Sequence, residues 1–355
     1  MSDPRVNLLD LEPDVLHATL VRHFAERGTR EFRARQVSRW IFEDDVTSFE
    51  AMTDLPLVER EALARSFDLS EPEVATISVS EDGTAKHLWR LDDGELIESV
   101  LIPAGDRLTL CISSQAGCAM GCTFCATGWG GFRRHLTPGE IVSQFRGARR
   151  WAAANRYGAI SNIVYMGMGE PLANRDAVFT SLTLLNHGYD VGARRITVST
   201  VGVVPGIDAL AERPEQFGLA VSLHAPDEEL RRELIPLEKR WPLPVLMEAL
   251  RRFDAAGGRR ITFEYTMIEG VNDDLSLVPG LAEMARTTHA FVNLIPFNPI
   301  PDREWQASPM AQIREFAHAL EGRGVEVFVR EPRGRDIAAA CGQLRTERMV
   351  QIAPK

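Results

Sequence analysis

The feature that most constrains the fold is a regular alternation of strand and helix patterns that begins near residue 108. Six short apolar runs rich in β-branched residues recur along the chain, separated by longer stretches with helical spacing of apolar residues. Repeated strand–helix units place their strands in a parallel sheet with helices outside it, because such crossovers have a fixed hand. The predicted strands are 109–114, 162–168, 195–200, 219–224, 261–267 and 292–297.

The number of these units decides whether the barrel closes. A closed TIM barrel has eight strand–helix units, so six leave the barrel open. The sequence therefore predicts an α/β fold with a partial (β/α)6 barrel over residues 108–324. A further strand pattern, "VEVFVRE", precedes a tail rich in Gly and Arg, and residues 325–355 are assigned to this strand and loop.

Two other zones precede the barrel. Residues 1–75 carry apolar residues at helical spacing, as in "DVLHATLVRHFAERG", and predict a helical accessory domain. Residues 76–107 change to short runs separated by "EDG" and "DDG", which are typical of hairpin turns. This second zone predicts a short antiparallel β meander.

Composition indicates a protein of the cytoplasm. The 355 residues are 45% hydrophobic and 25% charged, and no apolar run reaches the roughly 18 residues of a membrane span. The start, "MSDPRVNLLD", has neither the basic nor the apolar part of a signal peptide. We expect a cytoplasmic monomer without a membrane partner. Structural disulfides are rare in that compartment, so the five cysteines are better explained as metal ligands or reactive thiols.

The net charge of −10 argues against a nucleic-acid partner, but the charge is unevenly distributed. Residues 1–90 hold 11 Lys and Arg against 18 Asp and Glu, a charge of −7, so the other residues carry only −3. Arginine is clustered locally at several points of the chain. Such clusters are either solvated faces or parts of an RNA-binding surface, and the sequence leaves both interpretations open. The clusters are Arg133 and Arg134, Arg194 and Arg195, Arg259 and Arg260, and Arg330, Arg333, Arg335, Arg345 and Arg348.

Three of the cysteines lie in one short segment, "CAMGCTFC", at Cys118, Cys122 and Cys125. Three thiolates cannot complete a tetrahedral zinc site, which needs four ligands. A 4Fe–4S cluster takes one cysteine per iron, so three would leave one iron open for a substrate or cofactor. The segment follows the first predicted barrel strand, at the end where βα-barrel active sites are built.

The C-x₃-C-x₂-C spacing, with Phe124 before the last cysteine, resembles the cluster loop of the radical S-adenosylmethionine (SAM) superfamily. In that superfamily SAM chelates the open iron and is cleaved to a 5′-deoxyadenosyl radical. The resemblance therefore implies a 4Fe–4S cluster held by Cys118, Cys122 and Cys125, with SAM bound to it.

Short polar residues follow several of the other predicted strands. Gly169 and Glu170 in "MGMGEP" end the second strand, where glycine admits close backbone approach and the carboxylate can accept from a cation. In a radical SAM protein these groups suit the amino group, carboxylate and ribose of SAM, although each could instead cap the next helix. The further predicted cofactor contacts are Ser199, Ser222, Leu223, His224 and Asn298.

Most of the chain, from about residue 32 to 344, resembles the RlmN and Cfr family of radical SAM RNA methyltransferases. Segments that carry the resemblance include "TLCISSQAGCAMGCTFCATG", "YMGMGEPLAN", "VSLHAPDEELR" and "VREPRGRDIAAACGQL". The cysteine before the cluster motif and the "AACGQL" ending are the parts specific to that family.

By this resemblance the activity is methylation of carbon 2 of adenosine in 23S ribosomal RNA and in the anticodon loop of some tRNAs, with SAM used twice per turnover. The family mechanism makes Cys341 a methyl carrier, Cys111 its partner in a transient disulfide, and Glu98 the base that removes the C2 proton. It also implies an electron donor such as flavodoxin or ferredoxin. Methylation of carbon 8, the Cfr-type reaction, is the alternative within the family.

Each catalytic residue also has a simpler interpretation from sequence alone. A lone cysteine such as Cys111 is usually a small core residue, and Glu98 in an apolar strand would usually face solvent. Cys341 lies among Gly, Arg and Asp, which predicts a mobile polar loop whose thiol can react. Two functions of other classes remain open, a ferredoxin-like electron carrier and a zinc-stabilised RNA-binding module.

Overall fold

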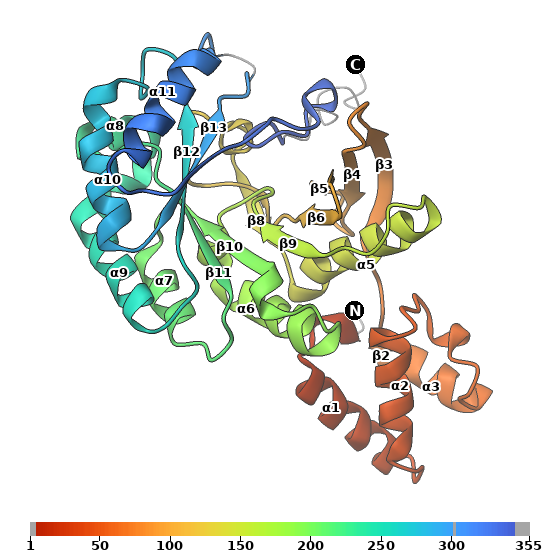
Figure 1. Ribbon diagram of the computed structural model, residues 1–355. Coiled ribbons are helices and arrows are strands. Elements are labelled where there is room, and N and C mark those ends of the chain that lie inside the picture. The colour runs from red at the N-terminus through yellow and green to blue at the C-terminus, as the bar shows by residue number, and fades with distance from the viewer. Residues whose placement is uncertain (1–4, 301–302, 345–355) are drawn as a thin grey trace.

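The computed structural model describes residues 5–300 and 303–344. Its centre is a ten-stranded sheet with the order β14-β13-β12-β11-β10-β9-β6-β5-β4-β3 (Figure 1). The neighbouring strands from β14 to β6 pair in parallel, which confirms the predicted α/β fold with an open barrel. These parallel strands are β6 (Arg107–Cys111), β9 (Asn162–Tyr165), β10 (Ile196–Thr200), β11 (Gly218–Ser222), β12 (Thr262–Met267), β13 (Phe291–Pro296) and β14 (Val327–Val329).

Helices connect these strands and lie on the outer side of the curved sheet (Figure 1). The first begins at Pro138 because the Thr137 side chain accepts from the amide of Glu140, whose carboxylate accepts from the amide of Thr137. The helices are α5 (Pro138–Ala154), α6 (Arg175–Thr183), α7 (Val204–Ala211), α8 (Glu228–Leu234), α9 (Leu243–Ala255), α10 (Val278–Thr287) and α11 (Met310–Glu321).

The antiparallel strands continue the same sheet. β3 (Glu73–Val79), β4 (Ala85–Arg90) and β5 (Leu96–Ala104) pair in sequence, and β5 then pairs with β6. The predicted meander is therefore one wing of the barrel sheet. It brings β5 beside the strand that leads into the cysteine loop.

The second barrel strand is shorter than the prediction of 162–168, because β9 ends at Tyr165. Gly167 explains the early end, since a Cβ on this residue would lie 2.6 Å from the Ile112 carbonyl oxygen. The chain after β9 therefore turns tightly against the end of β6.

The N-terminal helices form a separate lobe with its own apolar core (Figure 1). They are α1 (Pro13–Glu26), α2 (Phe32–Phe42) and α3 (Leu57–Ser66), and the short strands β1 (Val6–Asn7) and β2 (Phe67–Asp68) pair beside them. No helix in the described stretches is both long enough and apolar enough to span a bilayer.

One buried arginine joins this lobe to the barrel. The Arg146 side chain on α5 is fully buried and donates to the carbonyls of Ile41 at 2.8 Å and Val46 at 2.7 Å. Its guanidinium also pairs with Asp45 at 3.1 Å and with Glu71. Since both acids are themselves largely buried, the lobe depends on this cation.

We predict that Arg146→Met destabilises the docking of the lobe by about 3–5 kcal/mol, because Asp45 and Glu71 lose their fully buried cation and the Ile41 and Val46 carbonyls lose their donor. Arg150→Met is the matched control, since Arg150 pairs with the same two acids but is 36% exposed. Urea unfolding and hydrogen exchange of α1–α3 measure the effect. Equal loss of stability in the two variants would contradict the assignment.

Candidate active site

The cysteine segment forms a loop closed by a small hairpin. β7 (Gln115–Gly117) pairs with β8 (Phe132–His135), and the three cysteines lie between them. Gly117 adopts a φ of +74°, and a Cβ there would lie 1.9 Å from the Gly131 carbonyl oxygen. That carbonyl accepts from the amide of Cys118 at 3.1 Å. A glycine at this position thus lets the loop close on itself.

The three thiols are close enough to affect one another. Burial, and after it the neighbouring Cys125 and Glu170, raise the pKa of Cys118 to about 12. Burial also raises the pKa of Cys122, with added contributions from Cys125 and Cys118. Metal binding requires thiolates, so occupation of this loop must release protons. Within residues 5–300 and 303–344, no three His, Cys, Asp or Glu side chains are already drawn around one point as metal ligands.

Glu170 forms hydrogen bonds that connect the segments following β9 and β10. Its carboxylate accepts from the amides of Leu172 at 3.1 Å and Val201 at 2.9 Å, and its own amide donates to the Gln115 side chain at 2.8 Å. Burial raises the pKa of Glu170 to about 7, against the lowering effect of these amides. The Thr200 side chain is a third hydrogen-bond partner of this carboxylate, so one of its four lone pairs can still accept from a ligand.

The glycine before it serves a packing role as well. Gly169 has a φ of +103°, and a Cβ there would lie 2.5 Å from the Gln115 side chain. The close approach that the sequence attributed to a ligand is thus an approach to another part of the protein. The contact of Gly169 with SAM stays a prediction.

His224 is held as a neutral ring beside the cysteine loop. Its Nδ1 accepts from the amide of Thr266 at 3.0 Å, so the proton is on Nε2. Burial, with a smaller effect of Arg231, lowers the pKa of His224 to about 3. The ring lies against Phe124, with 4.3 Å between centroids. The buried Nε2 has no hydrogen-bond partner in the described part of the chain, which fits a site that a ligand completes.

The remaining predicted contacts lie at the same rim. Ser199 is buried near the end of β10, and Ser222 is half-buried at the end of β11. Leu223 is fully buried and its amide donates to the Glu264 carbonyl at 3.1 Å. The structure thus gathers these residues at the carboxyl ends of neighbouring strands, as predicted, while their contact with SAM is untested.

Asn298 holds the segment that carries Cys341. Its Nδ2 donates to the Cys341 carbonyl at 3.1 Å, and its Oδ1 accepts from Arg335 at 2.9 Å. Both ends of the amide therefore serve the loop. This is a role that the sequence did not reveal, and contact of Asn298 with SAM remains a prediction.

The Cys341 segment also bonds directly to the cysteine loop. The amide of Ala126 donates to the Gly342 carbonyl at 2.7 Å, and the Thr127 hydroxyl donates to the Leu344 carbonyl at 2.6 Å. Leu344 is buried, as are two alanines before Cys341. The prediction of a loose polar loop is therefore wrong for this stretch, because its apolar residues pack and its carbonyls are bonded.

Cys341 lies near enough to Cys111 to affect its pKa. Cys111 is buried at the end of β6 and Cys341 is exposed, and both are free thiols. Burial raises the pKa of Cys111, and the neighbouring Cys341 raises it further. Desolvation by the surrounding protein also raises the pKa of Cys341, and the nearby Glu264 adds to this shift.

Glu98 faces the interior, so the solvent-facing alternative is wrong. It is 3% exposed, and its carboxylate pairs with Lys86 at 3.0 Å. Val100 of β5 is the register partner of Cys111 on the neighbouring strand β6. Glu98 lies two residues before Val100 and therefore on the same face of β5. The sheet thus places Glu98 and Cys111 on one face.

Sequence reasoning missed three polar residues of this site. Lys86, Gln115 and Glu264 contact the predicted residues, yet each lies in an unremarkable strand or turn. Only the alternation of side chains along β4, β7 and β12 could have indicated which of them face inward.

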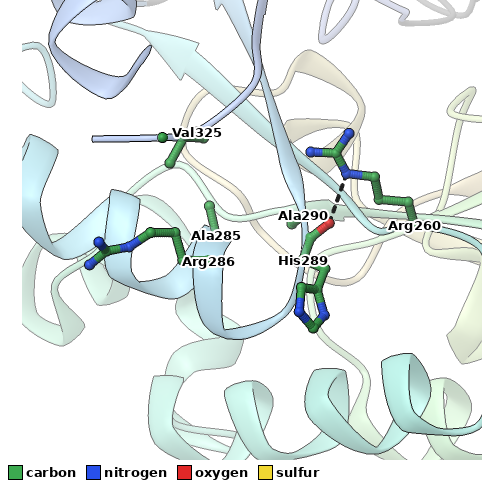
Figure 2. A pocket seen from close by; sticks show the side chains of 7 residues that line it. Arg260, Ala285, Arg286, His289, Ala290 and Val325 are labelled. Carbon is green, nitrogen blue, oxygen red and sulfur yellow. Dashed lines mark hydrogen bonds between the residues drawn. The ribbon is translucent and has the colours of Figure 1, made fainter. Parts of the chain in front are cut away.

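A separate cavity of about 350 Å³ lies at the opposite end of the sheet (Figure 2). Its lining residues precede β12, β13 and β14 or end α10, so they lie at the amino ends of the strands. Arg260 is engaged there by the His289 carbonyl at 2.8 Å and by Glu326. The cavity is therefore remote from the thiols. It has no part in the candidate site.

Two of the clustered arginines, Arg134 and Arg260, are paired with acidic side chains. Arg134 pairs with Glu140 at 2.7 Å and with Asp93 at 2.5 Å. Arg345 and Arg348 lie outside the described residues.

Comparison with known proteins assigns the family. The profile of the radical SAM superfamily matches residues 112–275, and that of the ribosomal RNA large subunit methyltransferase N-terminal domain matches residues 6–69. A probable dual-specificity RNA methyltransferase RlmN of Gemmatimonas aurantiaca is 51% identical over 98% of this chain and 95% of that protein. The chain belongs to the RlmN family.

Other RlmN relatives agree. The dual-specificity RNA methyltransferase RlmN of Marinomonas sp. is 42% identical over 96% of this chain and 93% of that protein. A crystal structure of a radical SAM methyltransferase from Sphaerobacter thermophilus superposes with a TM-score of 0.90 at 44% identity, covering 96% of this chain and 99% of that one. The predicted family and fold are thereby confirmed.

Membership of the RlmN family implies an iron–sulfur cluster and SAM, and the residues fit both groups. The loop brings three thiols near one another, and thiolates are the ligands that iron–sulfur clusters take. The buried Nε2 of His224 and the Glu170 carboxylate are the polar groups available to a bound cofactor.

We predict that Glu170→Gln lowers the free energy of unfolding by about 1–3 kcal/mol, because the amide NH₂ would face a backbone donor that the carboxylate now satisfies. Glu264→Gln is the matched control, since that buried carboxylate accepts a side-chain bond from Asn293 at 3.0 Å, and the carbonyl of glutamine can accept the same bond. Urea denaturation midpoints measure both. A smaller loss in Glu170→Gln than in Glu264→Gln would contradict the structural role.

Proposed function

We propose that this chain methylates carbon 2 of adenosine in 23S ribosomal RNA and in the tRNA anticodon loop, through a methyl-cysteine at Cys341 and a transient Cys111–Cys341 disulfide. The observation that carries the proposal is the proximity of Cys341 to Cys111, on a segment that is hydrogen-bonded to the three-cysteine loop. The names of the relatives, dual-specificity RNA methyltransferases, support the substrate class.

The target carbon explains why so many thiols are needed. C2 of adenine is electron-poor and cannot displace a methyl group from a sulfonium. When bound, the cluster and SAM supply the one-electron chemistry that activates a methyl group held on the enzyme. The chain itself supplies the carrier, because the Cys341 thiolate is a nucleophile that can accept a methyl group from SAM.

The remaining residues complete the transfer. Once the methylene carbon of Cys341 has bonded to C2, the adduct would return one electron to the bound cofactor, and Glu98 accepts the proton from C2. The Cys111 thiolate then attacks the Cys341 sulfur, and the carbon–sulfur bond breaks with its electron pair on the methylene carbon, which takes up a proton to become the methyl group. A disulfide forms and the methylated base leaves. A cytosolic reductant resets this disulfide, and a flavodoxin or ferredoxin supplies electrons for the activation.

The adenosine must leave its base stack to reach these residues. The N-terminal lobe and the exposed arginines are the candidate RNA-docking surfaces in this proposal. The carboxyl rim of the sheet is where the base enters, because Cys111, Cys341 and Glu98 all lie there.

The direct test is mass spectrometry of nucleosides after incubation of the reconstituted enzyme with ribosomal RNA and tRNA under reducing conditions. We expect 2-methyladenosine, and 8-methyladenosine as the sole product would contradict the proposal. Zinc in place of iron, with no cleavage of SAM, would contradict the radical chemistry.

Two cysteine variants test the roles of the thiols. Cys341→Ala should abolish methylation, because the carrier is lost. Cys111→Ala should still methylate Cys341 and then accumulate a covalent RNA–protein adduct, visible on a denaturing gel. Full activity of either variant would refute the thiol mechanism.

A further inference from the structure

Lys86 makes two contacts that join both halves of the site. Its ammonium pairs with the Glu98 carboxylate at 3.0 Å and donates to the Ala338 carbonyl at 3.2 Å. Ala338 lies three residues before Cys341. One side chain therefore touches the proposed base and the segment that presents the methyl carrier.

The sheet register explains why Lys86 reaches Glu98. Along β4, His87 and Trp89 are buried on one face, where His87 also contacts Trp151 of α5. Lys86 points to the other face, since side chains alternate along a strand. Lys86 pairs in register with Val100, two residues from Glu98 on β5, so a diagonal contact joins the two charges.

The loop that carries Ala338 is docked on the β3–β4 turn. The Asp336 carboxylate accepts from the Ser80 hydroxyl at 2.6 Å, and the amide of Gly334 donates to Asp82 at 2.9 Å. Ala338 itself has a φ of +48°, a left-handed conformation that is unfavourable for alanine. The bond from Lys86 helps to hold that conformation at the point nearest Cys341.

The positive charge of Lys86 also affects the ionisation of Glu98. The Glu98 side chain is 4% exposed and that of Lys86 is 15% exposed, so the carboxylate is largely removed from water. Burial disfavours an ionised carboxylate, whereas an adjacent cation favours it. The titratable groups that share this face of the sheet are Glu73 on β3, Lys86 and Arg90 on β4, and Arg107 and Cys111 on β6, with Cys341 near Cys111.

We propose that Lys86 is a positioning residue that keeps Glu98 ionised as the base and orders the loop bearing Cys341. This inference rests on the proposed function. In the step concerned, the C2–H bond of the adduct breaks, the proton bonds to a Glu98 oxygen, and the electron pair stays on the ring. No oxidant or reductant enters this proton transfer.

The test compares Lys86→Met with Arg90→Met and Lys86→Arg. Arg90 is the matched control because it is a cation on the same face of β4, but it is exposed and pairs with Glu73 at 3.8 Å. Three measurements are made on each reconstituted enzyme: methylation of the Cys341 peptide, lifetime of the RNA–protein adduct, and the pH profile of single-turnover product formation.

We expect Lys86→Met to retain methylation of Cys341 and to form the adduct, but to resolve it about tenfold or more slowly near pH 7. Loss of the cation disfavours the ionised base, so the acidic limb of the pH profile should move to higher pH. Lys86→Arg should return the acidic limb to its wild-type pH, and Arg90→Met should leave that pH unchanged.

A Lys86→Met enzyme with the wild-type pH profile and adduct lifetime would overturn the proposal. A profile of unchanged shape but reduced height, with a lower unfolding midpoint, would overturn it too, because it would show a purely structural role. Failure of the proposed function is distinct, since the unsubstituted enzyme would then form neither methylated Cys341 nor an adduct.

Discussion

The docking of the C-terminal segment onto the cysteine loop is the interaction on which the site depends. The Gly342 and Leu344 carbonyls accept from Ala126 and Thr127, immediately after the third cysteine of the loop. These bonds join chain segments more than 200 positions apart in sequence. They fix the Cys341 segment against the cysteine loop, and the bond from Asn298 to the Cys341 carbonyl holds it from the other side.

Buried charged side chains make the other contacts between remote segments, and each pairs with a side chain of opposite charge. Arg146 fastens the helical lobe to α5, and the pair of Lys86 and Glu98 fastens the antiparallel wing to the Cys341 loop. A buried ion pair adds little net stability, but removing one partner is costly, so such pairs specify geometry. The site is built from pieces that these pairs hold in place.

Much of the fold was predictable because it follows from the spacing of apolar residues and from capping residues within short segments. The period of apolar residues marked the barrel strands, and the Thr137–Pro138 start marked α5. The errors arose where distant contacts override local signals. β9 ends early because Gly167 must pass the Ile112 carbonyl, and the Cys341 segment packs although its neighbours in sequence are polar.

By itself the sequence determined the chemistry available to this chain: three thiols at C-x₃-C-x₂-C spacing, two isolated thiols, and polar residues at strand ends. Residue types and short spacings are local properties, so they can be read without coordinates. The tertiary structure alone decided which groups meet. The register of β4 and β5 places Lys86 beside Glu98, and Asn298 donates a hydrogen bond to the Cys341 carbonyl. Such pairings depend on contacts between remote segments, which no local pattern records.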